Sequence, residues 1–486
     1  MREFDITIVG LGPTGGTLAN LLAMHGFSIL ILDREKSFYP LPRAVHFDDE
    51  IMRVFQTIGI TKEFLKYTII NKGTKFVNSK EQVILDWPRP KKITENGWYP
   101  SYRFHQPDLE KHLRKKLKNY NNVLIKQNSE VIKIINQKNN VDIDYVNSIN
   151  NKIYSVKSKY LVGCDGANST TRKQIKTKMD NLGFTQKWAV VDLILKNNKK
   201  NLPDRTIQYS NPKQPATYCR NVGKRRRWEF AIKKNISDKK VLSENYIWNF
   251  LKPWLNKKEA ILERKTIYQF ESAIARKWRR GRVFIAGDAA HLMPPFMGQG
   301  MCAGIRDVSN LAWKIASCLR NKHNEHVLNS YQTERSHNVK EYIETTMRMG
   351  EFVNAVESIQ ITNNIKSDNK GIKSMQSIKP KLGKGLGYLK DKNRGKIFPQ
   401  FTFKKNKKLD NDFSKKGILI LSSDVKTNIS KNYSLQSSKN LKLLSSYLKN
   451  LNSKAILVRP DRFILASANS NQEINSLLKK YSFILR

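Results

Sequence analysis

The feature that most constrains the fold is a glycine-rich turn placed directly after an apolar segment near the N-terminus. The apolar segment, residues 6–9, leads into three glycines, and a helical pattern follows at 18–25. The glycines have the spacing Gly-x-Gly-x-x-Gly: Gly10, Gly12 and Gly15. Glycines at this spacing permit a tight turn and a close approach of the backbone to a pyrophosphate, and the positive end of the helix favours the anion. The pattern predicts a Rossmann-like unit that binds a dinucleotide.

The second apolar segment, residues 28–32, ends at Asp33. An acidic residue at this point of such a unit can accept hydrogen bonds from a ribose. Alone, these two segments leave open which dinucleotide is bound.

Two later motifs narrow the choice. Asp165 and Gly166 follow a short apolar segment at 159–164. The other motif is richer in glycine and proline, and comprises Gly287, Asp288, His291, Pro294, Pro295, Gly298, Gln299 and Gly300. Three motifs in this order resemble the single-component FAD-dependent aromatic hydroxylases, the para-hydroxybenzoate and phenol hydroxylase group. Within that group, segments 42–50, 298–307, 310–314 and 459–463 are similar to those of the 3-(3-hydroxyphenyl)propionate hydroxylases.

The resemblance implies an FAD site built from all three motifs. The first motif would bind the ADP half, Asp288 the ribityl chain, and Asp165 both FAD and the nicotinamide donor. Arg43 and Gln106 match positions that contact FAD, and surface capping of the following helices is the alternative for each. The residues expected to bind the cofactor are Gly10, Gly12, Pro13, Thr14, Gly15, Asp33, Arg34, Arg43, Gln106, Asp165, Gly287, Asp288, Pro295, Gly298, Gly300 and Met301.

The reaction implied by the resemblance is hydroxylation of a phenolic substrate, such as a 3-(3-hydroxyphenyl)propanoate, to a catechol. NADH or NADPH would reduce FAD, and O2 would form a C4a-hydroperoxide that must be shielded from water. The phenol ring supplies its own nucleophilicity, so no side chain is assigned as the catalyst. Weak candidates are Asp48 as a base, His46 in a proton relay and Pro295 in the shielding wall. For Asp48, the alternative to a role as base is capping of a helix. For His291 and Asp307, a structural role is the alternative to a direct role in the site.

The resemblance implies an α/β fold of discontinuous domains. Residues 1–70, 101–180 and 276–355 are expected to form a Rossmann-like FAD-binding domain. Residues 71–100 and 181–275 would form an inserted antiparallel β domain for the substrate. A linker or loose loop is expected at 356–395, including the glycines at 383–387, which follow no strand. Residues 396–486 would form a short thioredoxin-like appendage.

The charge of the chain raises a different hypothesis. The formal net charge is +47, and a basic protein of this kind can attract polyanions. The lysines are spread along the whole length together with many Asn and Ile, which is typical of coding bias. No specific nucleic acid is therefore expected as a partner. The excess charge also suits anionic small molecules such as NADPH.

Other patterns set the expected surroundings. Neither the four cysteines nor the histidines show the spacing of a metal site, and no secretory signal or membrane span is visible. A cytoplasmic enzyme is expected, with a homodimer as one assembly. Two rival functions stay open: a flavin hydroxylase of a polyketide or quinone precursor, and a basic flavin-containing RNA-associated protein.

Overall fold

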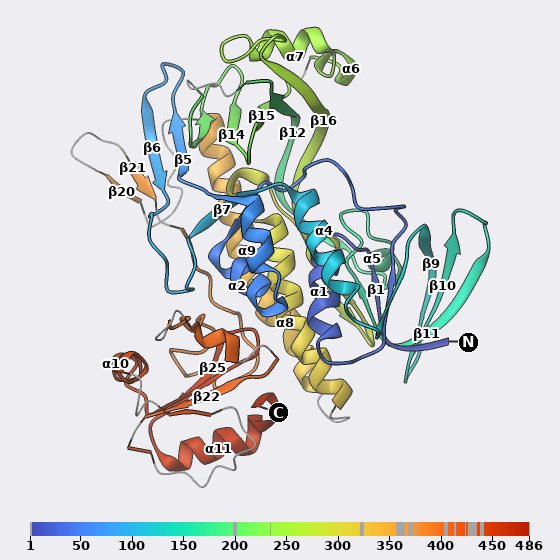
Figure 1. Ribbon diagram of the computed structural model, residues 1–486, viewed down its shortest axis with the longest axis vertical. Helices are drawn as coiled ribbons and strands as arrows, with labels where there is room; N and C mark the ends of the chain where they lie inside the picture. The colour runs from blue at the N-terminus through green and yellow to red at the C-terminus, as the bar shows by residue number, and fades with distance from the viewer. Residues whose placement is uncertain are drawn as a thin grey trace.

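The computed structural model describes residues 2–197, 202–233, 235–320, 325–355, 365–367, 373–375, 377–402, 407–412, 415–422, 424–425, 435–437 and 442–485. Within these residues, two large sheets and two small ones surround long central helices (Figure 1). Parts of the expected linker at 356–395 and of the expected appendage at 396–486 lie outside the described residues.

The first large sheet carries the glycine-rich turn. Its strand order is β17 (Arg279–Arg280), β18 (Val283–Ile285), β11 (Ile153–Gly163), β1 (Arg2–Val9), β2 (Ile29–Leu32) and β8 (Val123–Lys126). β1 runs parallel to both β2 and β11, and its side chains Ile6 and Ile8 are fully buried. Burial on both faces is typical of a parallel sheet covered by helices. A hairpin of β9 (Ser129–Asn136) and β10 (Val141–Asn147) extends this sheet from β11.

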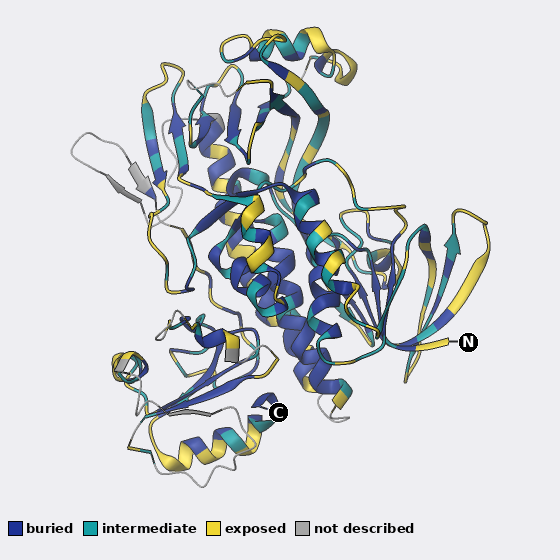
Figure 2. Cartoon of the chain, in the orientation of Figure 1, coloured by how far each residue is buried: buried dark blue, intermediate teal, exposed yellow. Residues whose placement is uncertain are grey.

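Helices cover the first sheet and fill the centre of the molecule. They are α1 (Pro13–Ala23), α4 (Gln106–Leu117), α5 (Thr170–Gln174), α8 (Gly300–Arg320) and α9 (Glu325–Ala355). Figure 2 shows that α8 is buried along most of its length. Gly304 lets α8 approach α1, because a Cβ there would lie 2.5 Å from Thr14 Oγ1 and 3.1 Å from Gly287 Cα. No helix in the described part of the chain combines the length and the apolar character needed to cross a bilayer.

The second large sheet lies at one end of the molecule (Figure 1). Its order is β19 (His291–Leu292), β16 (Ala260–Ala275), β12 (Met179–Leu195), β15 (Arg225–Ala231), β14 (Ala216–Arg220), β13 (Thr206–Tyr209), β5 (Gly73–Val77), β6 (Val83–Pro88), β21 (Lys373–Met375) and β20 (Ile365–Ser367). On one face, Trp228 and Phe230 pack with α6 (Asp238–Val241) and α7 (Glu244–Leu251). The alternate residues, such as Arg227 and Glu229, point to the opposite face because side chains alternate along a strand.

The strands of a small three-stranded sheet lie in sequence between strands of the two large sheets. It consists of β3 (His46–Asp48), β7 (Ser101–Phe104) and β4 (Thr68–Ile70), and it leads into α2 (Asp49–Ile58), α3 (Thr61–Phe64) and the short turn η1 (Leu65–Tyr67). Phe47 and Tyr102 stack with their ring centroids 5.2 Å apart in an aromatic core with Phe104. The apolar side chains on this face of the sheet are therefore buried in that core.

The C-terminal segment has its own small sheet, in the order β23 (Leu435–Ser437), β22 (Ile418–Leu421), β24 (Ala455–Val458) and β25 (Ile464–Ala468). The other elements of this segment are η5 (Leu409–Asp412), α10 (Lys442–Asn450), α11 (Asn471–Tyr481) and η7 (Ser482–Leu485). The stretch before it differs from the expected loose loop. Gly383 and Gly385 pack so closely on α9 that a Cβ would lie 2.3 Å from Thr333 O or Glu334 Cγ, and β20 and β21 extend the second sheet.

Candidate active site

An open cleft runs along the carboxyl ends of β1, β2 and β11. Ligands of open α/β sheets bind at this edge. The cleft brings together eight of the residues expected to hold the cofactor: Gly10, Gly12, Pro13, Asp33, Arg34, Arg43, Gln106 and Asp165. Residues from four separate stretches of the chain therefore meet at the site that the glycine-rich turn indicated.

The three glycines of the turn have different reasons to be glycine. Gly10 has a φ of +94°, and a Cβ there would lie 2.5 Å from Cys164 O. A Cβ at Gly15 would lie 2.0 Å from Gly10 O. Gly12 has an ordinary φ of −74°, and a Cβ built on it meets no atom of the described residues within 4 Å, apart from its neighbours in the chain. The protein itself therefore requires Gly10 and Gly15, whereas the space beside Gly12 is left open toward the cleft.

The start of α1 is prepared for an anion. Gly12 is the N-cap of α1, and no side chain caps the helix there. The first N–H groups of a helix have no intrahelical acceptor, and the helix dipole is positive at this end. Pro13 and Thr14 occupy the first two helical positions. A phosphate-bearing ligand in the cleft fits these free donors.

Asp33 and α4 form the wall beyond the turn. The Asp33 carboxylate accepts hydrogen bonds from the backbone N–H of Leu11 at 3.1 Å and of Glu35 at 3.1 Å. Arg114 donates to Leu11 O at 3.0 Å and lies 3.5 Å from the Asp33 carboxylate. The turn that presents Asp33 to the cleft is therefore held from two sides.

Gln106 is bound at both ends of its amide. Its Oε1 accepts from Ala44 N at 2.7 Å, and its Nε2 donates to Glu110 Oε1 at 2.8 Å. Gln106 thus fastens the loop before β3 to α4 while it lines the cleft. Arg43 in the same loop is exposed, and its guanidinium lies 4.5 Å from the centre of the Tyr39 ring.

Asp165 lines the cleft, but its carboxylate organises its own turn. One oxygen accepts from Ser169 Oγ at 2.5 Å, and the other accepts from the N–H of Thr171 at 2.9 Å and its Oγ1 at 3.0 Å. These bonds start α5. Asp165 therefore shapes the rim of the cleft through the backbone, with Gly166 and Asn168 beside it.

Asp288 is exposed. Within the described part of the chain it forms no hydrogen bond and no ion pair. It follows β18 in the short turn η2 (Gly287–Ala289). Although the residue is exposed, protein atoms surround its carboxyl group closely enough to raise the pKa of Asp288, and His291 and Arg43 act in the opposite direction. A free carboxylate at this position can accept hydrogen bonds from ligand hydroxyls.

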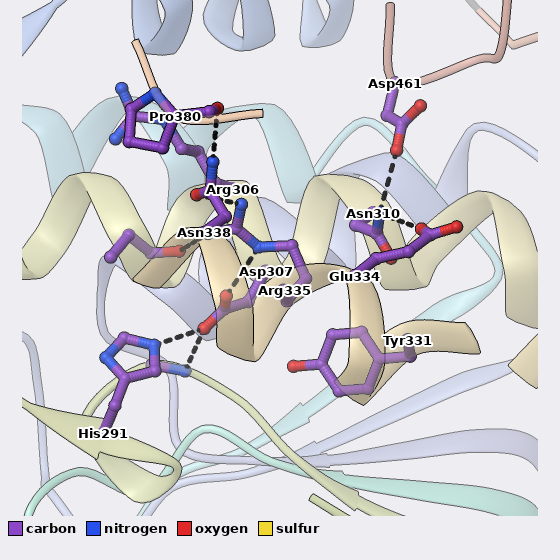
Figure 3. Close-up of polar contacts among 12 residues, drawn as sticks. His291, Arg306, Asp307, Asn310, Tyr331, Glu334, Arg335, Asn338, Pro380 and Asp461 are labelled. Carbon is purple, nitrogen blue, oxygen red and sulfur yellow. Dashed lines mark hydrogen bonds and ion pairs between the residues drawn. The ribbon is translucent and has the colours of Figure 1, made fainter. Parts of the chain in front are cut away.

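Asp307 and His291 belong to a buried polar network rather than to the cleft (Figure 3). Asp307 accepts from Gly287 N at 3.0 Å, from His291 Nε2 at 2.6 Å and from Arg335 Nε at 2.9 Å. Burial favours the neutral form of Asp307, but His291 and Arg335 outweigh it and lower its pKa. This network fixes the turn that carries Asp288.

Asp48 is the N-cap of α2, and its carboxylate is already engaged. Its Oδ1 accepts from Ile51 N at 3.2 Å, and its Oδ2 is bound by Gln299 and by the guanidinium of Arg306. Burial opposes the charged form, but Arg306 outweighs it and lowers the pKa of Asp48. A carboxylate held in this way is a weak proton acceptor, so the capping alternative describes Asp48 better than a role as base.

The segment before α8 forms a rigid wall. The turn η3 (Pro295–Met297) places Phe296 against Trp188 and Phe184, with ring centroids 5.6 and 5.9 Å away. Gly298 has a φ of +63° and accepts a hydrogen bond through its carbonyl from His46 Nδ1 at 3.3 Å. The remaining expected residues of this segment, Gly300 and Met301, begin α8.

Several cleft residues were not expected from the sequence. They include Ser37, Phe38, Tyr39, Glu110, Arg114, Ser129, Glu130, Val131, Cys164, Asn168 and Thr170. Glu110 and Arg114 follow Gln106 at intervals of four residues, so projecting the helix from Gln106 would have placed them on the same face. The strand and loop residues give no such local signal.

The chain was compared with known proteins. Residues 3–346 match the model of the family described as FAD binding domain. A probable NADH-specific resorcinol 4-hydroxylase of Rhodococcus jostii strain RHA1 is 35% identical, and the match covers 72% of this chain and 65% of the relative. A 3-(3-hydroxy-phenyl)propionate/3-hydroxycinnamic acid hydroxylase of Mycolicibacterium gilvum strain PYR-GCK is 30% identical, with 72% and 60% covered. The matched region thus spans less than two thirds of these relatives.

Solved structures are similar over the full length. The aklavinone-11 hydroxylase in complex with FAD and aklavinone superposes with a TM-score of 0.80 at 16% identity, covering 100% of both chains. The flavin-dependent monooxygenase PieE, in complex with FAD and substrate, gives a TM-score of 0.79 at 15% identity, with 99% of each chain covered. The fold is therefore that of the FAD-binding flavoprotein monooxygenases.

Proposed function

Because this chain belongs to the FAD binding domain family, we propose that it is a hydroxylase that uses FAD, NADH or NADPH, and O2 to convert a phenolic compound to a catechol. The observation that carries the proposal is the cleft beside Gly12. Among the described residues, only the chain neighbours of Gly12 come within 4 Å of a Cβ built on it, and this leaves space in front of the uncapped start of α1. This space fits the pyrophosphate of FAD.

The residues of the chain divide the work of binding. The turn at Gly10–Gly15 and the start of α1 would hold the phosphates, Asp33 the ribose and Asp288 the ribityl hydroxyls. FAD, when bound, supplies the redox chemistry with O2 that the side chains lack. Pro295 and the wall around Phe296 would exclude water from the reacting face. None of these roles asks a side chain to act as the base.

The names of the relatives support a small phenol as substrate. One is named for resorcinol and for NADH, and others for 3-(3-hydroxyphenyl)propionate. We therefore propose a hydroxyphenyl compound of this size and favour NADH as the donor. We also propose a cytoplasmic homodimer without a specific nucleic acid partner, and the domain division stated for 1–70, 101–180 and 276–355 against 71–100 and 181–275.

The test is to purify the protein and to measure three quantities together. We expect a yellow protein with about one FAD per chain, slow oxidation of NADH alone, and faster oxidation with a phenol that yields a hydroxylated product. A protein with bound FAD that no phenol stimulates, or a protein without FAD, would contradict the proposal. Replacing the phenol by a polyketide or quinone precursor in the same assay tests the rival substrate class.

A further inference from the structure

The β3–β7 strand pair turns two nitrogen-bearing side chains toward the second sheet. His46 on β3 lies directly opposite Arg103 on β7, so the two side chains share one face. The neighbouring pair, Phe47 and Tyr102, fills the apolar core on the other face. Arg103 Nη2 donates a hydrogen bond to Thr206 Oγ1 on β13 of the second sheet. The two polar side chains therefore lie between the FAD-binding part and the second sheet.

Arg103 is a buried cation that forms no ion pair among the described residues, although the charge of Glu229 on the facing sheet acts against the lowering of its pKa by burial. Its side chain is 6% exposed, its Nε has no hydrogen-bond partner, and it forms no ion pair with a carboxylate in the described part of the chain. Neighbouring arginines are paired: Arg227 with Asp192 at 2.7 Å, and Arg205 with Asp86. An unpaired buried charge costs several kcal/mol of stability.

Arg89 adds a second positive charge at the same place. It is half-buried, stacks 4.0 Å from the centre of the Trp87 ring and donates to Ser377 Oγ at 2.5 Å, and it also forms no ion pair with a described carboxylate. Burial and the charge of Arg103 lower the pKa of Arg89 to about 10, so Arg89 remains charged at neutral pH. Glu229 lies on the facing sheet, but Arg227 is 3.6 Å from it.

His46 supplies an unused acceptor beside these charges. Burial, Arg103 and Arg89 lower the pKa of His46 to about 3, so its ring is neutral. Its Nδ1 faces Gly298 O, which can only accept, and Nδ1 therefore carries the proton. The buried Nε2 is left as an acceptor without a partner. An O–H donor of a ligand would satisfy it.

The location connects this group to the cleft. Gly298, which binds His46, precedes α8 in the wall described above, and Gln106, three residues beyond Arg103, lines the cleft. His46 and Arg103 do not line the cleft themselves, but they lie on strands whose neighbouring segments form its wall. An oxyanion would pair with the donors of Arg103, and a hydroxyl would pair with the acceptor of His46.

We infer that Arg103, supported by Arg89, recognises an oxyanion of the aromatic substrate, and that His46 accepts a hydrogen bond from a substrate hydroxyl. The inference rests on the proposed function and deepens it by naming the residues that set substrate specificity. The oxyanion is either a carboxylate attached to the ring system or the ionised phenol. The two sources share their chemistry and are separated by the choice of ligands below.

The experiment is calorimetric titration of the FAD-loaded protein with three compounds: benzoate, resorcinol and 3-(3-hydroxyphenyl)propanoate. The variants are Arg103→Gln, Arg103→Lys and Arg89→Gln. Arg53→Gln is the matched control, because Arg53 is a buried arginine that is bound to Asp410 away from this site. Arg89→Gln keeps the test valid if Arg103→Gln does not fold, since Arg89 is only half-buried.

For a carboxylate, Arg103→Gln should raise the Kd of benzoate and of the propanoate about 10- to 100-fold, Arg89→Gln by less, and resorcinol should change by less than about threefold. Arg103→Lys should recover most of the loss. For an ionised phenol, resorcinol and the propanoate should weaken together, and benzoate should not bind to the wild type.

Equal Kd values in wild type, Arg103→Gln and Arg89→Gln would overturn the inference, even if phenols are hydroxylated. Binding of benzoate through Arg103 without hydroxylation of any phenol would overturn the proposed function and leave the anion site standing. If none of the three compounds binds to the wild type, both fail.

Discussion

At the scale of single residues, the glycines of the turn differ in why they are glycine. Two of them are required by the fold, and one leaves space for a ligand. Gly10 and Gly15 are crowded by backbone oxygens, so any side chain there displaces the turn itself. A Cβ on Gly12 would meet no described residue beyond its chain neighbours, and its φ is one that any residue adopts. Similar glycines in one motif thus serve different purposes, and substitution can tell them apart.

Gly12→Val is therefore expected to fold with a melting temperature close to that of the apo wild type and to lose FAD. The branched side chain would fill the space in front of α1 without meeting the protein. Gly15→Ala is expected to destabilise the apoprotein by about 1–3 kcal/mol, because its Cβ would overlap Gly10 O. The measurements are the ratio of flavin to protein absorbance and thermal unfolding of both variants. Stoichiometric FAD in Gly12→Val would show that the cleft does not hold the pyrophosphate there.

At the scale of elements, helix starts are held by residues that also reach across the molecule. Asp48 caps α2 and at the same time binds Arg306 of α8, which donates to Glu50 Oε2 at 2.6 Å as well. The cap thus joins two helices that are more than 240 residues apart in sequence. A side chain used in this way contributes to assembly of the site rather than to proton transfer.

Asp48→Asn should separate these two roles. The amide oxygen can still cap α2, but the ion pair with Arg306 is lost, so stability should fall by about 1.5–3 kcal/mol. Hydroxylation at neutral pH should fall by less than about tenfold. A general base would lose about 10²- to 10⁴-fold. The rate is measured against pH at saturating phenol, and a loss of that larger size with unchanged thermal stability would restore Asp48 as the base.

The wall at η3 gives a second prediction for an element. Pro295 begins η3, and Phe296 is anchored between Trp188 and Phe184. Pro295→Gly should loosen the backbone there, since proline restricts φ and glycine does not. NADH oxidation should continue while product falls and H2O2 rises, with Pro295→Ala between the two. An equal loss of NADH oxidation and product, without additional peroxide, would exclude this segment as the shield.

At the scale of the whole molecule, buried charges join the C-terminal segment to the central helices. Arg459, in the turn between β24 and β25, lies 2.9 Å from Glu334 of α9, and Lys314 of α8 donates to the same carboxylate at 2.7 Å. Asp461 accepts from Asn310 at 3.2 Å (Figure 3). In Figure 1 the C-terminal segment lies beside this group of helices. Its position therefore depends on a few fully buried ion pairs.

Glu334 makes this contact sensitive to acid. Burial opposes its charge, but Arg459 and Lys314 outweigh it and lower the pKa of Glu334 from 4.5 to about 2. A lowered pKa stabilises the fold above 4.5, and this contribution is lost as the pH falls toward 2. Glu334→Gln should cost about 3 kcal/mol at pH 7, and the gap to wild type should narrow between pH 5 and 3. Thermal unfolding at several pH values measures the gap, with the exposed Glu351→Gln as control. A gap that is constant with pH would contradict the role of its charge.

The sequence by itself determined the local parts of this protein. The turn at Gly10–Gly15 and the strand ending at Asp33 could be predicted, because turn glycines and apolar periodicity act over a few residues. The FAD-binding fold followed from the order of these motifs. Residues 383–387 were predicted as a loose loop, since nothing in the local pattern shows that α9 packs on them.

Only the tertiary structure decided what the polar side chains do. Whether Asp48 is a base or a cap depends on Arg306, which comes from another helix, and Arg103 becomes buried only where β7 meets the second sheet. The charge state of a side chain is set by all the groups around it, and these arrive from distant points of the chain. The chemistry of the candidate site therefore depends on contacts between distant segments, which no local sequence pattern shows.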